Sequence, residues 1–284
     1  MTERSGPESA DLVVVDGLSA GAWIEPRLGG EFGAVTLQVP KGYEAYARVF
    51  HPVLDSDWNP MRWAEVAEKI GTTAHREMQW HAILGLASAD ELRGSREPGT
   101  AVGDRWAGHN PLTGVMTDET VDALCGVLAS HTADPDDCYF GLCVILGWEE
   151  SFSPSELKPL LKLPWGRDHI VLRGSLAAVD QIAEDWSKPS SSRAIITFHG
   201  SGEAPSELDP ADLVSRQAPN LIWPADRSWF VVSEVDFDST LVGGSAELVE
   251  AIVESSELEA WQLEPTDSLA ADADKVNRVL DRDG

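Results

Sequence analysis

Three carboxylates in the C-terminal part of the chain have a spacing that could support chemistry. Glu234, Asp236 and Asp238 alternate with Val235 and Phe237. Successive side chains of a β-strand point to opposite faces, so this spacing predicts three carboxylates on one face, with neighbours about 7 Å apart. Like charges so placed repel one another, and a partly buried set needs a cation, a basic partner or raised pKa values. The pattern therefore indicates a solvated acidic face, a cation site or acid–base catalysis.

Four other residues complete the set of binding candidates. Trp223 stands beside Pro224 in an expected turn, where a Trp either fills a satellite core or contacts a partner. Asp226 and Arg227 follow it, at the start of the next expected strand. His199 precedes a Gly-Ser-Gly sequence that lacks the spacing of a hydrolase nucleophile elbow.

No residue set has the spacing of a known cofactor or metal motif. The seven histidines include no HExxH pair, and the three cysteines, an odd number, suit reduced core positions better than a disulfide framework. Gly174-Ser175 and Gly243-Gly244-Ser245 lack the lysine of a phosphate-binding loop, so the serines are predicted to cap helices. We expect no cofactor and no bound metal.

The charge balance predicts what kind of partner the protein has. Asp and Glu number 48 against 21 Lys and Arg, which gives a net charge of −27. Such a field repels nucleic-acid phosphate and anionic lipid and favours a basic protein. Solubility and adaptation to high salt are alternative explanations of the acidity. The sequence contains no apolar run long enough for a membrane span, so we expect a cytoplasmic protein without a nucleic-acid or membrane partner.

The carboxylates belong to a strand, Gly-Gly-Ser turn and helix unit at residues 226 to 256. A degenerate version of the same unit occupies residues 136 to 186. Related units of this kind would each need a neighbour to cover their apolar faces. We therefore interpret the pair as a hypothetical internal pseudo-repeat.

Hydrophobic periodicity places the remaining elements. Strands are predicted at 12–15, 35–39 and 43–50, and an almost wholly apolar strand at 138–148 is expected in the middle of a sheet. Asn59-Pro60 predicts the start of a helix ending at Ile70, and Thr117 predicts the cap of a second helix ending at Ser130.

These elements predict an α+β fold, with a mixed, mostly antiparallel sheet and flanking helices. We expect one compact globule, with a β-rich region at residues 1–115 packed on an α+β body at residues 116–284.

Two runs, residues 42–52 (GYEAYARVFHP) and 219–227 (PNLIWPADR), resemble segments of a family of uncharacterised actinobacterial proteins. The similarity extends over most of the chain. The resemblance implies an intracellular bacterial protein and implies no activity or catalytic residue.

We expect an intracellular, non-enzymatic binding protein of a regulatory or immunity-like kind, which contacts a basic protein partner. The alternative is a carboxylate-based, metal-dependent hydrolase or transferase that uses Glu234, Asp236 and Asp238 with His199 or His51.

Overall fold

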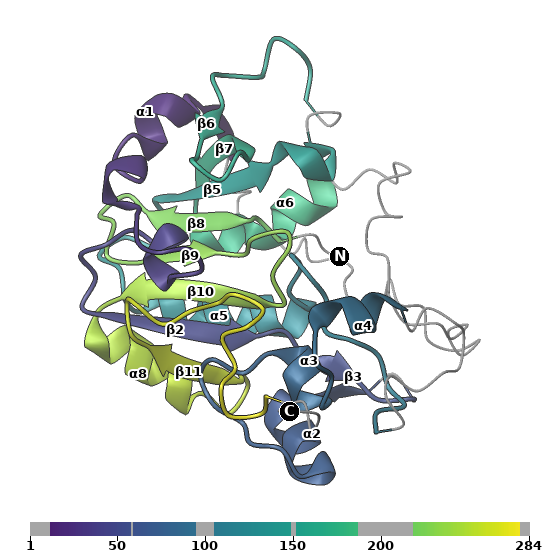
Figure 1. Cartoon of the computed structure of the whole chain (residues 1–284). Coiled ribbons are helices and arrows are strands. Elements are labelled where there is room, and N and C mark those ends of the chain that lie inside the picture. The colour runs from purple at the N-terminus through teal and green to yellow at the C-terminus, as the bar shows by residue number, and fades with distance from the viewer. Residues whose placement is uncertain (1–11, 58, 95–104, 149–151, 187–217, 279–284) are drawn as a thin grey trace, which may run out of the picture.

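In the computed structural model, which describes residues 12–57, 59–94, 105–148, 152–186 and 218–278, nine strands form one sheet (Figure 1). Their order is β1-β7-β5-β8-β9-β10-β2-β11, with β6 paired to β7, and every neighbouring pair is antiparallel. The strands are β1 (Val13–Val15), β2 (Ala45–Phe50), β5 (Cys138–Cys143), β6 (Leu161–Lys162), β7 (Asp168–Gly174), β8 (Leu221–Pro224), β9 (Phe230–Val232), β10 (Ser239–Gly244) and β11 (Ala260–Leu263). The predicted α+β fold is confirmed.

Helices pack on both faces of this sheet. One face is covered by α5 (Asp118–Ala129), α6 (Val179–Trp186) with the preceding turn η5 (Leu176–Ala178), and α8 (Ala246–Glu254). The opposite face carries α1 (Gly17–Gly21) and the short 3-10 turns η1 (Glu25–Arg27) and η2 (Val35–Leu37). Beyond one end of β2 lie α2 (Trp63–Ile70), α3 (Trp80–Ile83), α4 (Ala89–Gly94) and a small sheet of β3 (Val53–Leu54) and β4 (Pro60–Met61).

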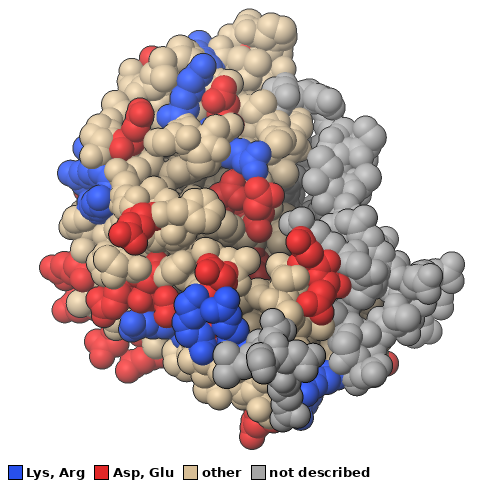
Figure 2. All heavy atoms as spheres, viewed as in Figure 1, with Lys and Arg blue, Asp and Glu red and all other residues tan. Residues whose placement is uncertain are grey.

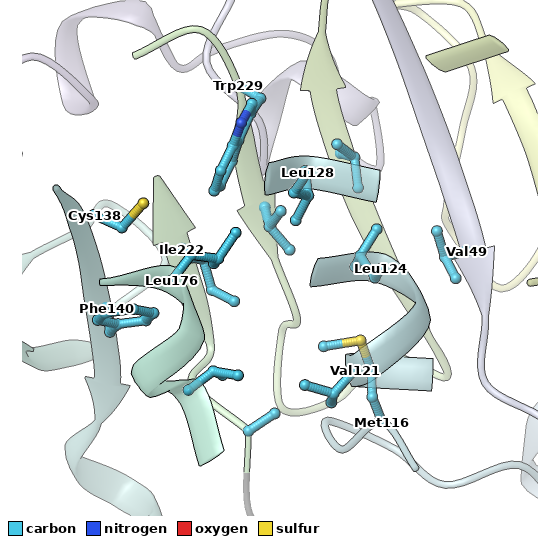
Figure 3. Packing of buried hydrophobic residues seen from close by; sticks show 14 of the residues in the cluster. Val49, Met116, Val121, Leu124, Leu128, Cys138, Phe140, Leu176, Ile222 and Trp229 are labelled. Atoms are coloured by element: carbon cyan, nitrogen blue, oxygen red, sulfur yellow. The ribbon is translucent and has the colours of Figure 1, made fainter. Parts of the chain in front are cut away.

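The main core lies between the sheet and its helical layer. Thr117 caps α5 by accepting a hydrogen bond from the N–H of Thr120, as its position predicts. The apolar stripe of α5 then faces the strands, and Leu124 and Leu128 are at most 1% exposed (Figure 3). Burying each leucine contributes about 1.5–3 kcal/mol, so this stripe holds the helix on the sheet.

A second core lies on the opposite face of the sheet. It contains Trp23, Trp223 and Phe230, which come from the N-terminal segment, β8 and β9. A third cluster lies around α2 and α3 and contains Phe50, Trp63, Trp80 and Trp106. Most of the strand positions are therefore buried on both sides, which explains why the strand sequences are apolar without clear alternation.

Residues 35–39 were expected to form a strand, and this expectation is wrong. Val35, Thr36 and Leu37 form the 3-10 turn η2, and the N–H of Val39 donates to the oxygen of Val35 at 3.0 Å. Both valines are fully buried in the second core. A helical turn places residues four apart on the same side, so both valines can be buried. A strand also places them on the same side, so their spacing alone does not distinguish the two structures.

The helix expected from Asn59 begins later. Pro60 and Met61 form β4, and α2 begins at Trp63 after Arg62, which makes no side-chain cap. Glu259, which precedes β11, accepts hydrogen bonds from the N–H groups of Trp63 at 2.6 Å and Ala64 at 2.8 Å. A carboxylate from a distant part of the chain therefore caps α2.

The apolar segment 138–148 also differs from the prediction. Its strand, β5, lies in the middle of the sheet as expected, but it ends at Cys143 and a 3-10 turn, η3 (Val144–Leu146), follows. The N–H of Cys143 donates to the side chain of Asn220 at 3.0 Å instead of to a neighbouring strand. This contact ends the ladder between β5 and β8.

The pseudo-repeat is not confirmed. Each unit contains an antiparallel strand pair followed by a helix, and α6 and α8 pack on the same face. However, six residue pairs join β5 to β7, whereas three join β9 to β10, and β8 lies between the two pairs. Strands β1 and β2 belong to the same sheet as the later strands, and the division at residue 115 stays a prediction.

No helix within the described ranges is long and apolar enough to cross a membrane.

Candidate functional site

The three candidate carboxylates lie in a turn and not on a strand, so that prediction was wrong. Strand β9 ends at Val232, and residues 233–238, called the carboxylate turn below, connect it to β10. The N–H of Phe237 donates to the oxygen of Glu234 at 3.0 Å, which closes the turn. Antiparallel neighbours such as β9 and β10 need a reversal between them, and an alternating polar pattern does not distinguish that reversal from a strand.

Gly114 holds the carboxylate turn against the body of the protein. Its N–H donates to the oxygen of Phe237 at 2.7 Å, and its backbone has φ of +72°. A Cβ at this position would lie 2.6 Å from the Cα of Val235. Both the positive φ and the close approach require glycine here.

Arg167, which immediately precedes β7, holds two of the carboxylates. Its Nε lies 3.1 Å from Oε1 of Glu234, and its Nη2 lies 2.7 Å from Oδ2 of Asp236. The N–H of Asp236 also donates to Glu234 at 2.7 Å. The repulsion expected between these two carboxylates is therefore offset by one shared guanidinium.

Asp238 faces in another direction and pairs with Arg48. Oδ1 of Asp238 lies 3.3 Å from Nη2 of Arg48, whose side chain is 2% exposed. Arg48 also donates to Oγ of Ser239 at 2.8 Å and to the oxygen of Met78 at 2.9 Å. Burial lowers the pKa of Arg48, and the charge of Asp238 acts against that shift. Two arginines thus divide the three carboxylates between them.

A cation site would need the carboxylates to converge, which they do not. Within the described ranges, no group of three or more His, Cys, Asp or Glu side chains is placed to hold a metal ion.

A small hollow lies beside the carboxylate turn, at the ends of β5, β7, β8 and β9, and has a cavity volume of about 10 Å³. Ligand pockets usually enclose about 300–1,000 Å³, so this hollow has room for about one water molecule. Its lining residues are Cys143, Trp165, Arg167, His169, Asn220, Leu221, Val232, Ser233, Glu234 and Val235.

Cys143 and His169 face each other in this hollow because the register pairs them across β5 and β7. Sequence reasoning did not associate them, since only the strand pairing brings together residues so far apart along the chain. Burial lowers the pKa of His169 to about 4 and raises the pKa of the Cys143 thiol. Nδ1 of His169 is buried and has no hydrogen-bond partner in the part of the chain that the structure describes. A nucleophilic cysteine needs a lowered pKa, so this pair is not an activated one.

His51 is fully buried at the start of a hydrogen-bond chain that reaches the hollow. Its Nδ1 lies 2.8 Å from the oxygen of Leu112, and its Nε2 lies 2.9 Å from Oγ1 of Thr240, which also contacts Oγ of Ser233. A carbonyl only accepts, so Nδ1 carries the proton and Nε2 accepts from Thr240, which in turn accepts from Ser233. Burial lowers the pKa of His51 to about 4, so the imidazole is neutral at pH 7.

The other candidates lie apart from the hollow. Asp226 accepts from Oγ1 of Thr132 and from the N–H groups of Ala133 and Ser228, each at 2.9 Å. Arg227 lies beyond it, with its guanidinium over the ring of a tryptophan of the second core. Trp223 is 1% exposed and lies in that core. His199 lies outside the described residues.

Both Gly-Ser turns begin helical elements, as predicted. Oγ of Ser245 accepts from the N–H of Leu248 at 3.2 Å, and Oγ of Ser175 accepts from the N–H of Ala177 at 3.3 Å. These serines therefore satisfy backbone donors that have no partner within the helix itself.

The outer side of the helical layer is acidic. Helices α5 and α8 contact each other and contain no Lys or Arg. Their exposed acidic side chains, called the acidic helical face below, are Glu119, Asp122, Glu247, Glu250 and Glu254. In the view of Figure 2, many acidic side chains lie at the lower left, where Figure 1 has α8.

Comparison of the chain with known protein families, with curated proteins and with solved structures finds no match to any of them.

Proposed function

We propose that the protein is an intracellular, non-enzymatic binding protein, regulatory or immunity-like, which contacts a basic protein partner through the acidic helical face. The observation that supports this proposal is the separation of charge within the molecule. The carboxylates of the carboxylate turn have arginine partners, whereas the sequences of α5 and α8 contain acidic residues and no Lys or Arg.

The spacing along α8 favours an external partner. Glu247 and Glu250 are three residues apart, and Glu250 and Glu254 are four apart, so all three lie on one side of the helix. Like charges at these spacings destabilise a helix by about 0.2–0.5 kcal/mol per pair. Lysine or arginine side chains of a partner would remove this repulsion and would accelerate association at low salt. Val253, 39% exposed, adds an apolar contact beside them.

The alternative proposal, a carboxylate-based and metal-dependent hydrolase or transferase, has less support. General acid or base catalysis needs a carboxylate within reach of a substrate. Glu234 and Asp236 share Arg167, Asp238 pairs with Arg48, and the adjacent hollow is small. A catalytic role would therefore require these ion pairs to open first.

Affinity capture with two charge-matched variants tests the proposed function. The full chain is immobilised, exposed to a bacterial lysate at low salt and eluted with high salt, and the eluted proteins are identified by mass spectrometry. One variant combines Glu247→Lys, Glu250→Lys and Glu254→Lys. The control combines Glu31→Lys, Asp57→Lys and Glu68→Lys, which are exposed positions elsewhere.

We expect the wild type and the control to retain the same basic proteins and the α8 variant to lose them. The two variants change the total charge equally, so a difference between them reports the position of the carboxylates on α8. Equal retention by both variants, or retention that high salt does not reverse, would contradict the proposal.

A further inference from the structure

Four aromatic rings form a continuous row on the face of the sheet opposite the acidic helical face. Tyr139 of β5 stacks on Trp223 of β8 with ring centroids 5.4 Å apart, and Trp223 lies 6.1 Å from Phe230 of β9. Trp23 meets the edge of Phe230 at 5.8 Å. These separations lie within the range of about 4.5–7 Å at which aromatic pairs attract.

Arginines lie at both ends of this row, but the two ends differ in charge. At one end, the guanidinium of Arg173 lies 5.4 Å from the ring centre of Tyr139 and binds Asp137 through two hydrogen bonds of 2.6 and 2.7 Å. At the other end, Arg27 and Arg227 lie 5.5 and 5.2 Å from the ring centre of Trp23.

Neither Arg27 nor Arg227 forms an ion pair with a described residue. The neighbouring Asp226 directs its carboxylate to the 132–133 segment and to the N–H of Ser228. Two guanidinium groups over one ring repel each other. Both arginines are exposed, and together they leave a local positive charge on a protein of net charge −27.

The backbone holds Arg227 in this position. Its φ is +58°, the one positive value among the described non-glycine residues. Its N–H donates to the oxygen of Pro224 at 2.9 Å, which closes the turn between β8 and β9. In Figure 2, basic side chains gather at the left edge of the face, where Figure 1 has this turn. Strained backbone of this kind is concentrated at functional sites.

Two buried donors lie next to the same arginines. Nε1 of Trp23, a residue that is 9% exposed, and the hydroxyl of Tyr43 have no hydrogen-bond partner among the described residues. The N–H of Lys41 donates to the oxygen of Arg27 at 2.8 Å, which brings the segment that contains Tyr43 beside Arg27. Burial raises the pKa of Tyr43, so the hydroxyl keeps its proton. An indole N–H can only donate. Both groups therefore need an acceptor that the described residues do not provide.

We propose that Trp23, Arg27, Tyr43 and Arg227 form a binding site for an oxyanion, the carboxylate or phosphate group of a small molecule. Such a group supplies acceptor lone pairs for the indole and the phenol and negative charge for the two guanidinium groups. The site lies across the sheet from the acidic helical face, so it is independent of the proposed protein partner.

Isothermal titration calorimetry of the full chain with inorganic phosphate and, separately, with acetate tests this site. Sodium chloride keeps the ionic strength constant in both titrations. The main variant is Arg227→Gly, because glycine accepts a φ of +58° and the fold should survive. The control is Arg173→Ala, which removes an arginine from the other end of the row and changes the net charge equally.

We expect saturable binding of at least one anion, weakened about tenfold or more by Arg227→Gly and changed less than about twofold by Arg173→Ala. Binding of phosphate alone or acetate alone would identify which of the two anionic groups the site takes. The absence of saturable binding for both anions would overturn the proposal and leave water as the acceptor for the two donors. Equal weakening by the two variants, or unchanged binding by a folded Arg227→Gly protein, would overturn it as well.

Discussion

Acidification should destabilise the protein through two buried histidines. His51 and His169 are 0% and 2% exposed, and burial lowers the pKa of each to about 4. In the unfolded chain their pKa is about 6.5. Between these values the unfolded state binds a proton that the folded state does not, so the stability present above pH 6.5 is lost as the pH falls towards 4.

The expected loss is large compared with the total stability of a domain. One pKa unit corresponds to about 1.4 kcal/mol, so at pH 5 each histidine costs about 2 kcal/mol relative to pH 7, and the two together about 4 kcal/mol. Burial also lowers the pKa of His81 and His109, which adds to the loss. Acidification also reduces the net charge of −27, and the weaker self-repulsion acts in the opposite direction.

Urea unfolding followed by tryptophan fluorescence at pH 7, 6 and 5, in high salt to screen the net charge, measures the effect. His169→Asn and His51→Asn should each lower the stability at pH 7. Each should also reduce the change between pH 7 and pH 5 by about 2 kcal/mol, and the double variant by about 4 kcal/mol. A wild-type change below about 1 kcal/mol, or equal changes in wild type and variants, would refute the reasoning.

Three further variants test individual contacts by urea unfolding at pH 7. Glu259→Ala removes the acceptor for two N–H groups of α2 and should cost about 2 kcal/mol, whereas the exposed Glu257→Ala should cost less than about 0.5 kcal/mol. Asp238→Ala leaves the buried Arg48 without a counter-charge and should cost about 3 kcal/mol, and a cost below about 1 kcal/mol would mean that the other partners of Arg48 suffice. Ser245→Ala removes the cap of α8 and should cost about 1 kcal/mol, and no loss would contradict the capping role.

Features that depend on a few neighbouring residues were predictable from the sequence. Thr117 and Ser245 cap their helices as their positions predict, because a cap involves residues within three positions of each other. The apolar run that forms β5 also predicted a central strand correctly. Local patterns failed where the same residue pattern suits both a strand and a turn. Strands were predicted at residues 35–39 and in the carboxylate turn, but tertiary contacts favour turns at both places.

The sequence by itself determined the acidity of the protein, its α+β class and the positions of its helix caps, since composition and short-range periodicity specify them. The tertiary structure decided which charges meet. Arg167 and Glu234 are 67 residues apart, Arg48 and Asp238 are 190 apart, and neither pair has a local signal. Strand order alone brings Cys143 beside His169 and aligns the aromatic rows of β5, β8 and β9. Such contacts depend on how distant segments pair across the sheet, because the free energy of each contact is realised only once the intervening chain has folded.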